Sequence, residues 1–100
     1  MEKFKEYFEK KINEKREEIK FSGNTISDLM DVFNKLPDNW NEEGYIKIKG
    51  DNTTNYQFFL ADIPTKQLDK KEIWVTNVHN DNELKIKISE IEIIEPYIRD

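Results

Sequence analysis

The sequence contains no cysteine, and this absence sets the first limits on its chemistry. Without thiols the chain can form neither a disulfide nor a thiolate metal site, so it must fold by core packing alone or together with a partner. A chain that needs no oxidising compartment fits the cytoplasm best. We therefore predict a cytoplasmic protein.

Histidine and glycine are also scarce, which removes most catalytic signatures. His79 is the single histidine, and a lone histidine in a turn is typical of an exposed side chain rather than of a metal ligand. Only three glycines occur, and no GxGxxG motif, no GxxxxGK[ST] motif and no nucleophile beside a histidine can be recognised. The pairs Asp51–Asn52 and Asp81–Asn82 lack the ligand spacing of an EF-hand and indicate turns. We predict that the protein is not an enzyme and uses no metal and no cofactor.

Long apolar runs are missing as well. The charged opening MEKFKEYFEKK has no continuous apolar segment of the kind found in signal peptides, and no later run approaches a membrane span. The 100 residues are expected to form one domain, residues 1–100. Hydrophobic residues make up only 36%, but they are mainly isoleucine, phenylalanine, leucine and other aromatics, so we expect folding rather than disorder.

Lysine, isoleucine, asparagine and acidic residues are what the sequence has in quantity. Lysine outnumbers arginine fourteen to two, and Ala61 is the single alanine. Because codons for lysine, isoleucine and asparagine are AT-rich, this usage indicates the AT-rich genome of a bacterium or of its mobile elements. The formal charge of −5 makes the whole chain mildly repulsive to nucleic acids and anionic membranes.

Two amphipathic helices are predicted in the first third of the chain. Over residues 2–18 the apolar side chains recur at helical spacing on one face. They are Phe4, Tyr7, Phe8 and Ile12, followed by Ile19. This face is typical of packing against a core, and a role as a homodimerisation arm stays open. Gly23 and Asn24 end the helix, with a short extended piece expected near residues 19–21.

The second helix is predicted over residues 26–36. Thr25 can cap its first turn together with Asp28, in a variant of the capping box in which aspartate replaces glutamate. Its apolar stripe contains Ile26, Leu29, Met30, Phe33 and Leu36. Pro37 ends the helix, because proline lacks an amide hydrogen and disfavours helical geometry in the residue before it.

The remainder is predicted to form strands near residues 45–49, 56–61, 72–78, 84–88 and 91–95, from alternation of apolar and polar residues. Residues 50–55 and 62–71 are expected to be a turn and a loop. The apolar set Leu84, Ile86 and Ile88 is even-numbered, whereas Ile91 and Ile93 are odd-numbered, so a bulge or break is needed near Ser89. We predict an α+β fold in which two N-terminal amphipathic helices pack on a curved antiparallel sheet of four to five strands.

Two surfaces are candidates for binding. Lysines on the polar faces of predicted strands, with Trp74 nearby, have the residue types that bind single-stranded nucleic acid by phosphate contacts and base stacking. This set is Lys47, Lys49, Trp74, Lys85 and Lys87. The alternative is that these lysines keep the solvent-facing side soluble and protect strand edges.

The second surface is acidic. Carboxylates around the second helix and near the C-terminus have the charge needed to address a basic groove on a partner protein. This set is Asp28, Asp31, Asp38, Glu42, Glu43, Glu90, Glu92 and Glu95. The alternative is again an ordinary solvated surface.

The stretch TISDLMDVFNKLPDNW, followed by the strand YIKIK, resembles many small proteins of phages and mobile elements of AT-rich bacteria. The resemblance covers residues 25–49 and implies no active site. It implies a setting in which small acidic proteins inhibit host defence enzymes, as anti-CRISPR proteins do, and immunity proteins that neutralise toxins have a similar build.

Three functions therefore remain open from the sequence. The first is a non-catalytic inhibitor that binds a larger, nucleic-acid-handling protein such as a host defence nuclease, with an immunity protein as a related alternative. The second is a small nucleic-acid-binding sheet module that uses Trp74 and the strand lysines. The third is a small-molecule sensor with an apolar pocket between helices and sheet.

Overall fold

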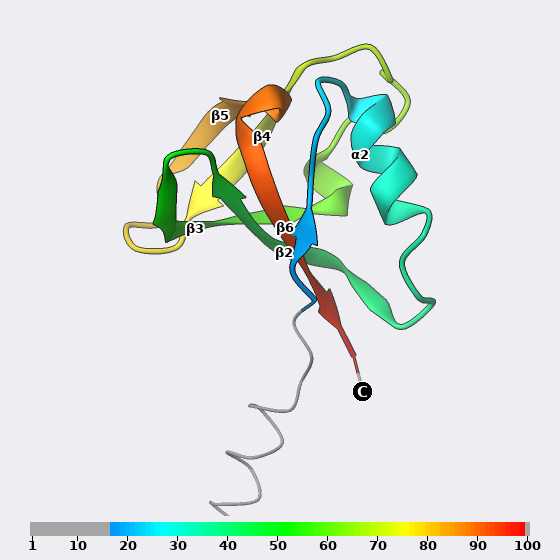
Figure 1. Ribbon diagram of the computed structural model, residues 1–100, viewed down its shortest axis with the longest axis horizontal. Coiled ribbons are helices and arrows are strands. Elements are labelled where there is room, and N and C mark those ends of the chain that lie inside the picture. The colour runs from blue at the N-terminus through cyan, green and yellow to red at the C-terminus, as the bar shows by residue number, and fades with distance from the viewer. Residues whose placement is uncertain (1–16, 100) are drawn as a thin grey trace, which may run out of the picture.

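The described residues form one antiparallel sheet with a single short α-helix packed at its side (Figure 1). The computed structural model describes residues 17–99. The sheet has six strands in the order β1-β6-β2-β3-β4-β5. The prediction of two N-terminal helices on a sheet of four to five strands is therefore wrong, since residues 17–99 hold one α-helix and a larger sheet.

The elements follow one another with short connections. The strands are β1 (Ile19–Lys20), β2 (Trp40–Ile48), β3 (Asp51–Phe59), β4 (Glu72–Asn77), β5 (Glu83–Lys87) and β6 (Ile91–Ile98). The helix α2 spans Ile26–Phe33, and two 3-10 turns, η1 (Leu60–Asp62) and η2 (Ile88–Glu90), follow β3 and β5.

The predicted first helix lies almost entirely outside the described residues. Its last two residues, Glu17 and Glu18, are not helical. Ile19 pairs with Ile94 in the sheet, so this residue belongs to a strand and not to a helical face. β1 thus adds an edge strand beside β6, at the position where a short extended piece was expected.

Helix α2 begins as predicted but ends earlier. The Asp28 amide donates to the Thr25 hydroxyl oxygen at 3.4 Å, and the Thr25 amide donates to the Asp28 carboxylate at 3.2 Å, which completes the capping box. The α-helix stops at Phe33, and the predicted residues 34–36 form a tighter turn in which the Leu36 amide donates to the Phe33 carbonyl.

An aromatic stack joins the helix to the sheet. The Phe33 ring lies 5.0 Å from the Trp40 ring and 5.5 Å from the Phe58 ring, centroid to centroid. The Trp40 indole N–H donates to the Glu43 carbonyl at 3.0 Å. Trp40 therefore anchors the start of β2 in the core, although its polar neighbours predict a loop.

β2 starts five residues before the predicted strand because its first half is irregular. Glu42 has a φ of 58°, and the register against β6 shifts between Trp40 and Gly44. A Cβ at Gly44 would collide with the Glu95 carbonyl oxygen, so glycine permits the close approach of β2 and β6. Such a bulge hides the period of two on which strand prediction depends.

The β2–β3 turn is shorter than predicted. Ile48 pairs with Asp51, so only Lys49 and Gly50 lie in the turn, and Gly50 takes a φ of 82°. Residues 51–55 are therefore strand rather than turn. At the other end, β3 stops at Phe59 and the chain enters η1.

The predicted break near Ser89 is confirmed by η2, which separates β5 from β6. Ile88, the first residue of η2, is buried, as are Ile91 directly after it and Ile94. Ile93, which was expected on the core side, is only partly buried, because the β2–β6 register shifts between Lys47 and Ile48. The break lets one continuous chain keep its isoleucines in the core while it passes from the edge strand β5 to β6, between β1 and β2.

Candidate functional site

The most exposed large aromatic side chain of the described residues lies on the outer face of β4. Ile73 and Val75 point into the core, and Trp74 between them is 52% exposed. Lys85 lies directly opposite Trp74 on β5, and its Nζ sits 5.3 Å from the centre of the indole ring. This cation–π contact helps to hold a large apolar side chain in an exposed position.

Phe59 extends this exposed aromatic surface on β3. Gln57 pairs with Thr76, and Phe59 lies two residues beyond Gln57 while Trp74 lies two residues before Thr76. Both therefore point to the outer face of the sheet, where Phe59 is 39% exposed. The alternation in QFFL places Phe59 opposite in direction to Phe58, so the sequence contained the signal for its exposure.

A hollow of about 280 Å³ lies on the Glu72 side of Trp74. Three lysines and one glutamate give it a formal charge of +2. It is lined by Pro64, Lys70, Lys71, Glu72, Ile73, Trp74 and Lys85. We call it the basic hollow. Lys70 and Lys71 come from the loop before β4. The sequence predicts this segment as a loop and gives it no part in a binding site.

A smaller hollow of about 20 Å³ lies on the Thr76 side of the same indole. It contains two carboxylates and no basic residue, a formal charge of −2. It is lined by Gln57, Phe59, Asp62, Trp74, Val75, Thr76 and Glu83. We call it the acidic hollow, and we refer to Trp74, Phe59 and the two hollows together as the Trp74 surface.

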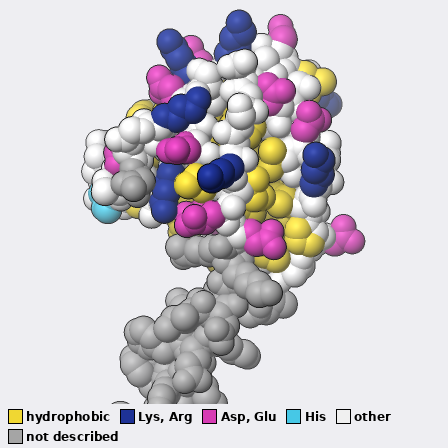
Figure 2. Space-filling model, in the orientation of Figure 1, with side chains coloured by type: hydrophobic (Ala, Val, Ile, Leu, Met, Phe, Trp, Pro, Cys, Tyr) yellow, Lys and Arg dark blue, Asp and Glu magenta, His cyan; other side chains and the backbone are white. Residues whose placement is uncertain are grey.

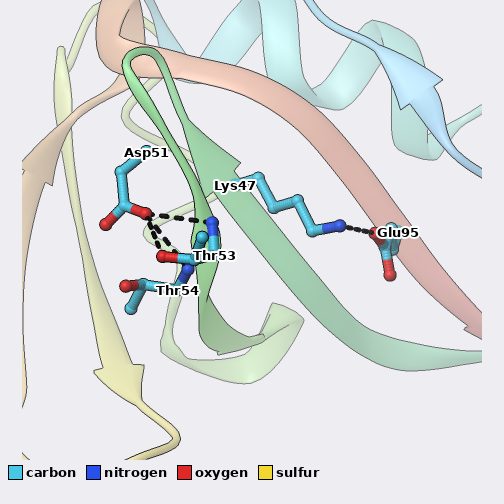
Figure 3. Close-up of polar contacts among 5 residues, drawn as sticks. All are labelled: Lys47, Asp51, Thr53, Thr54 and Glu95. Atoms are coloured by element: carbon cyan, nitrogen blue, oxygen red, sulfur yellow. Dashed lines mark hydrogen bonds and ion pairs between the residues drawn. The ribbon is translucent and has the colours of Figure 1, made fainter.

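The structure separates the predicted lysine set. Trp74 on β4 and Lys85 on β5 are in contact. Lys87 is exposed on β5, opposite Glu72 on β4. Lys47, in contrast, forms an ion pair with Glu95 at 3.1 Å (Figure 3). Lys49 is exposed in the β2–β3 turn and lines neither hollow.

The predicted acidic set is spread over α2, the loop after it, β2, η2 and β6, and none of its eight residues lines either hollow. Glu95 is 6% exposed and paired with Lys47. Glu43 accepts a hydrogen bond from the Asn41 side-chain amide at 3.0 Å. Asp31, Asp38 and Glu42 are exposed, as are Glu90 and Glu92. Figure 2 shows acidic and basic side chains interleaved over one face of the molecule, as on an ordinary solvated surface.

Asp28 has a structural role in this set. The backbone amide of Asn24 donates to its carboxylate at 2.8 Å, and the Thr25 amide donates to the same oxygen. These hydrogen bonds, that of Asn24 first, lower the pKa of Asp28. Asp28 is therefore explained by the start of α2 without any partner.

His79 and the asparagines around it form the β4–β5 turn. The His79 amide donates to the Asn77 side-chain oxygen at 2.9 Å, and Asp81 adopts a φ of 58°. Within residues 17–99, no group of three or more histidine, cysteine, aspartate or glutamate side chains is arranged to hold a metal ion. The same part of the chain contains no helix with the length and apolar character needed to cross a membrane.

Comparison with known proteins adds no family to this picture. No family model matches the chain, and no curated protein and no solved structure matches it.

Proposed function

We propose that this protein is a non-catalytic binding protein that inhibits a larger protein partner, and that the Trp74 surface makes the contact. The observation that carries this proposal is the 52% exposure of Trp74 between two hollows of opposite charge. Tryptophan is among the residues most enriched where binding energy concentrates in interfaces, and a charged rim around an aromatic centre is the usual anatomy of such a site.

The balance of charge favours a protein over a nucleic acid. A nucleic-acid footprint is a basic stripe that neutralises several phosphates. Around Trp74 the basic hollow is matched by an acidic hollow of equal and opposite formal charge. A partner that carries both signs of charge satisfies this surface, whereas a polyanion is repelled by one side of it.

Size, acidity and the resemblance of residues 25–49 to mobile-element proteins support the finer part of the proposal. In that setting the partner is a nucleic-acid-handling enzyme such as a host defence nuclease, and the action is anti-CRISPR-like. Neutralisation of a toxin, as by an immunity protein, is the related alternative. Cytoplasmic action belongs to the same proposal.

Affinity capture from a bacterial lysate tests the proposal when three baits are compared. The intact protein should retain a specific partner, identified by mass spectrometry, and Trp74→Ala should lose it. The matched control is Val78→Ala, which removes another exposed apolar side chain next to the same strand. Capture of nothing specific, or equal capture by the Trp74→Ala bait, contradicts the proposal.

A second candidate function is favoured by one observation, the presence of Lys70, Lys71 and Lys85 beside the indole of Trp74. Lysines beside an exposed aromatic ring can hold a phosphate and a stacked base of single-stranded nucleic acid. Binding to a fluorescent oligonucleotide should then weaken as salt rises and weaken further in the Lys85→Glu, Lys87→Glu variant. Absence of binding at low salt rejects this candidate.

A further inference from the structure

The two hollows lie at opposite ends of Trp74 along β4. The basic hollow includes Glu72 and Ile73, and the acidic hollow includes Val75 and Thr76. The neighbouring strand repeats this order, because Lys85 pairs with Trp74 and Glu83 pairs with Thr76. The formal charge therefore changes from +2 to −2 across a single exposed indole.

A charge pattern that reverses sign about its centre is complementary to itself. In an isologous dimer, a patch on one chain contacts a second patch on its partner, and the reverse contact occurs by symmetry. If the twofold axis lies in the interface and crosses β4 at Trp74, the two β4 strands face each other in opposite directions. Each basic hollow then faces the acidic hollow of the other copy, and the two indoles meet at the axis.

We propose that two copies of this chain associate through the Trp74 surface, with the Lys70 and Lys71 side of one copy against the Asp62 and Glu83 side of the other. The two faces of the proposed contact are complementary in charge, and both belong to this structure. Association also covers the two indoles and Phe59, which are exposed in the single chain.

This pairing is independent of the proposed function, but its consequence rests on that function. If the Trp74 surface also binds an inhibited partner, dimerisation buries that surface, and the partner must compete with the second copy of this chain. The active species is then the monomer, and its fraction rises on dilution.

Charge reversal tests the proposal, because reversing the charge of one hollow makes both hollows of a chain alike in sign. The first variant carries Lys70→Glu and Lys71→Glu, so both hollows become acidic. The second carries Asp62→Lys and Glu83→Lys, so both become basic. Sedimentation equilibrium should show a monomer–dimer equilibrium for the intact protein and a dissociation constant at least about tenfold higher for each variant alone.

The decisive sample is an equimolar mixture of the two variants. Their hollows are complementary on both sides of Trp74, so the mixture should form a one-to-one dimer that neither variant forms alone. Damage to folding cannot produce this restoration. A control with Lys20→Glu and Lys35→Glu changes the net charge by the same amount as the first variant, at exposed residues outside the surface, and it should dimerise like the intact protein.

Three outcomes overturn the inference. The intact protein is monomeric at every concentration measured, its dimer survives Trp74→Ala unchanged, or the mixed variants fail to associate. None of these results depends on the lysate capture described above, so a monomer that still retains a partner through Trp74 refutes self-association and leaves the proposed function standing.

Discussion

The Nζ of Lys47 on β2 lies 3.1 Å from a carboxylate oxygen of Glu95 on β6. Figure 3 shows this ion pair spanning two neighbouring strands. The two residues belong to the two surfaces that the sequence assigned to opposite kinds of partner, the lysines to nucleic acid and the carboxylates to a basic protein groove. Because each is occupied by the other, neither is free to serve its predicted partner, and the pair is part of the fold.

Removal of the Lys47 side chain should lower the free energy of unfolding more than neutralisation of Glu95. The Glu95 side chain is 7% exposed and the Lys47 side chain 22% exposed, so Lys47→Ala leaves a nearly buried carboxylate without its cation. We expect Lys47→Ala to lower the free energy of unfolding by about 2 kcal/mol, less than for a fully buried pair because Lys47 is partly solvated. Urea denaturation measures it.

Glu95→Gln is the comparison for that variant. A neutral amide in the same space keeps hydrogen-bonding capacity and leaves the more exposed Lys47 to be solvated, so the loss should be about 1 kcal/mol or less. The reverse order of the two losses would show that the Glu95 carboxylate does not need the Lys47 cation, and would contradict this account of the ion pair.

The contact between β2 and β6 also depends on Gly44. A Cβ at this position would meet the backbone of Glu95 and Pro96, which cannot move as a flexible side chain does. Gly44→Ala should therefore destabilise by about 2 kcal/mol or more, measured by thermal or urea unfolding.

Gly50→Ala is the matched control for close approach. Gly50 has a φ of 82° and nothing within 4 Å of an added Cβ, so alanine there meets conformational strain only. The cost should be about 1 kcal/mol. Gly44 does not share the positive φ of Gly50, so a loss at Gly44 no larger than that at Gly50 would show that β2 and β6 can separate enough to admit a methyl group.

The sequence predicts best where side chains alternate without interruption. Ile73 and Val75 are buried and Trp74 is exposed, as the period of two requires. The change from even-numbered to odd-numbered apolar positions near Ser89 marks the 3-10 turn η2, which separates β5 from β6. The first turn of α2 was predicted equally well, because its capping box consists of hydrogen bonds between Thr25 and Asp28, which are close in sequence.

The extent of the sheet could not be predicted because its remaining parts have no local signal. Residues 41–43 are polar, yet Trp40 before them stacks on Phe33 at the core and the register against β6 shifts between Trp40 and Gly44. β1 consists of two residues that need β6 to be a strand at all. The pairings of β1, Trp40 and Gly44 with β6 join residues more than fifty positions apart in the sequence, so no local pattern signals them.

The candidate site shows the same division. Exposure of Trp74 and Phe59 follows from alternation, but the loop residues Lys70, Lys71 and Asp62 reach the surface only through the path of the chain between β3 and β4. Residue types alone favoured two separate extended surfaces, one basic and one acidic. The fold instead places unlike charges on either side of one indole.

The stack of Phe33 on Trp40 and Phe58 should be the main contact between α2 and the sheet. Phe33 is 5% exposed, so Phe33→Ala removes a nearly buried ring and should lower the free energy of unfolding by about 3–5 kcal/mol. Phe59→Ala removes the same ring from the 39% exposed position and should cost about 1 kcal/mol or less. Similar losses for the two variants, measured by urea unfolding, would contradict the assignment of Phe59 to the outer face.

The start of β3 should make stability depend on pH in the acid range. The Asp51 carboxylate accepts hydrogen bonds from the Thr53 hydroxyl at 2.8 Å, the Thr53 amide at 3.0 Å and the Thr54 amide at 3.2 Å (Figure 3). These bonds, the Thr53 hydroxyl first, lower the pKa of Asp51 from 3.8 to about 2. Because the folded state favours the ionised form, its contribution is complete above pH 3.8 and is lost as the pH falls toward 2.

Asp51→Asn isolates this effect, because asparagine can accept the same hydrogen bonds without a charge that titrates. The melting temperature of the intact protein should exceed that of Asp51→Asn near neutral pH, and the difference should shrink between pH 4 and pH 2, over the range in which the Asp51 pKa lies. A carbon-detected NMR titration of the Asp51 carboxyl gives the pKa directly. A midpoint at 3.8 or above, or a constant difference in melting temperature across that range, would show that Thr53 and Thr54 do not hold the ionised carboxylate in solution.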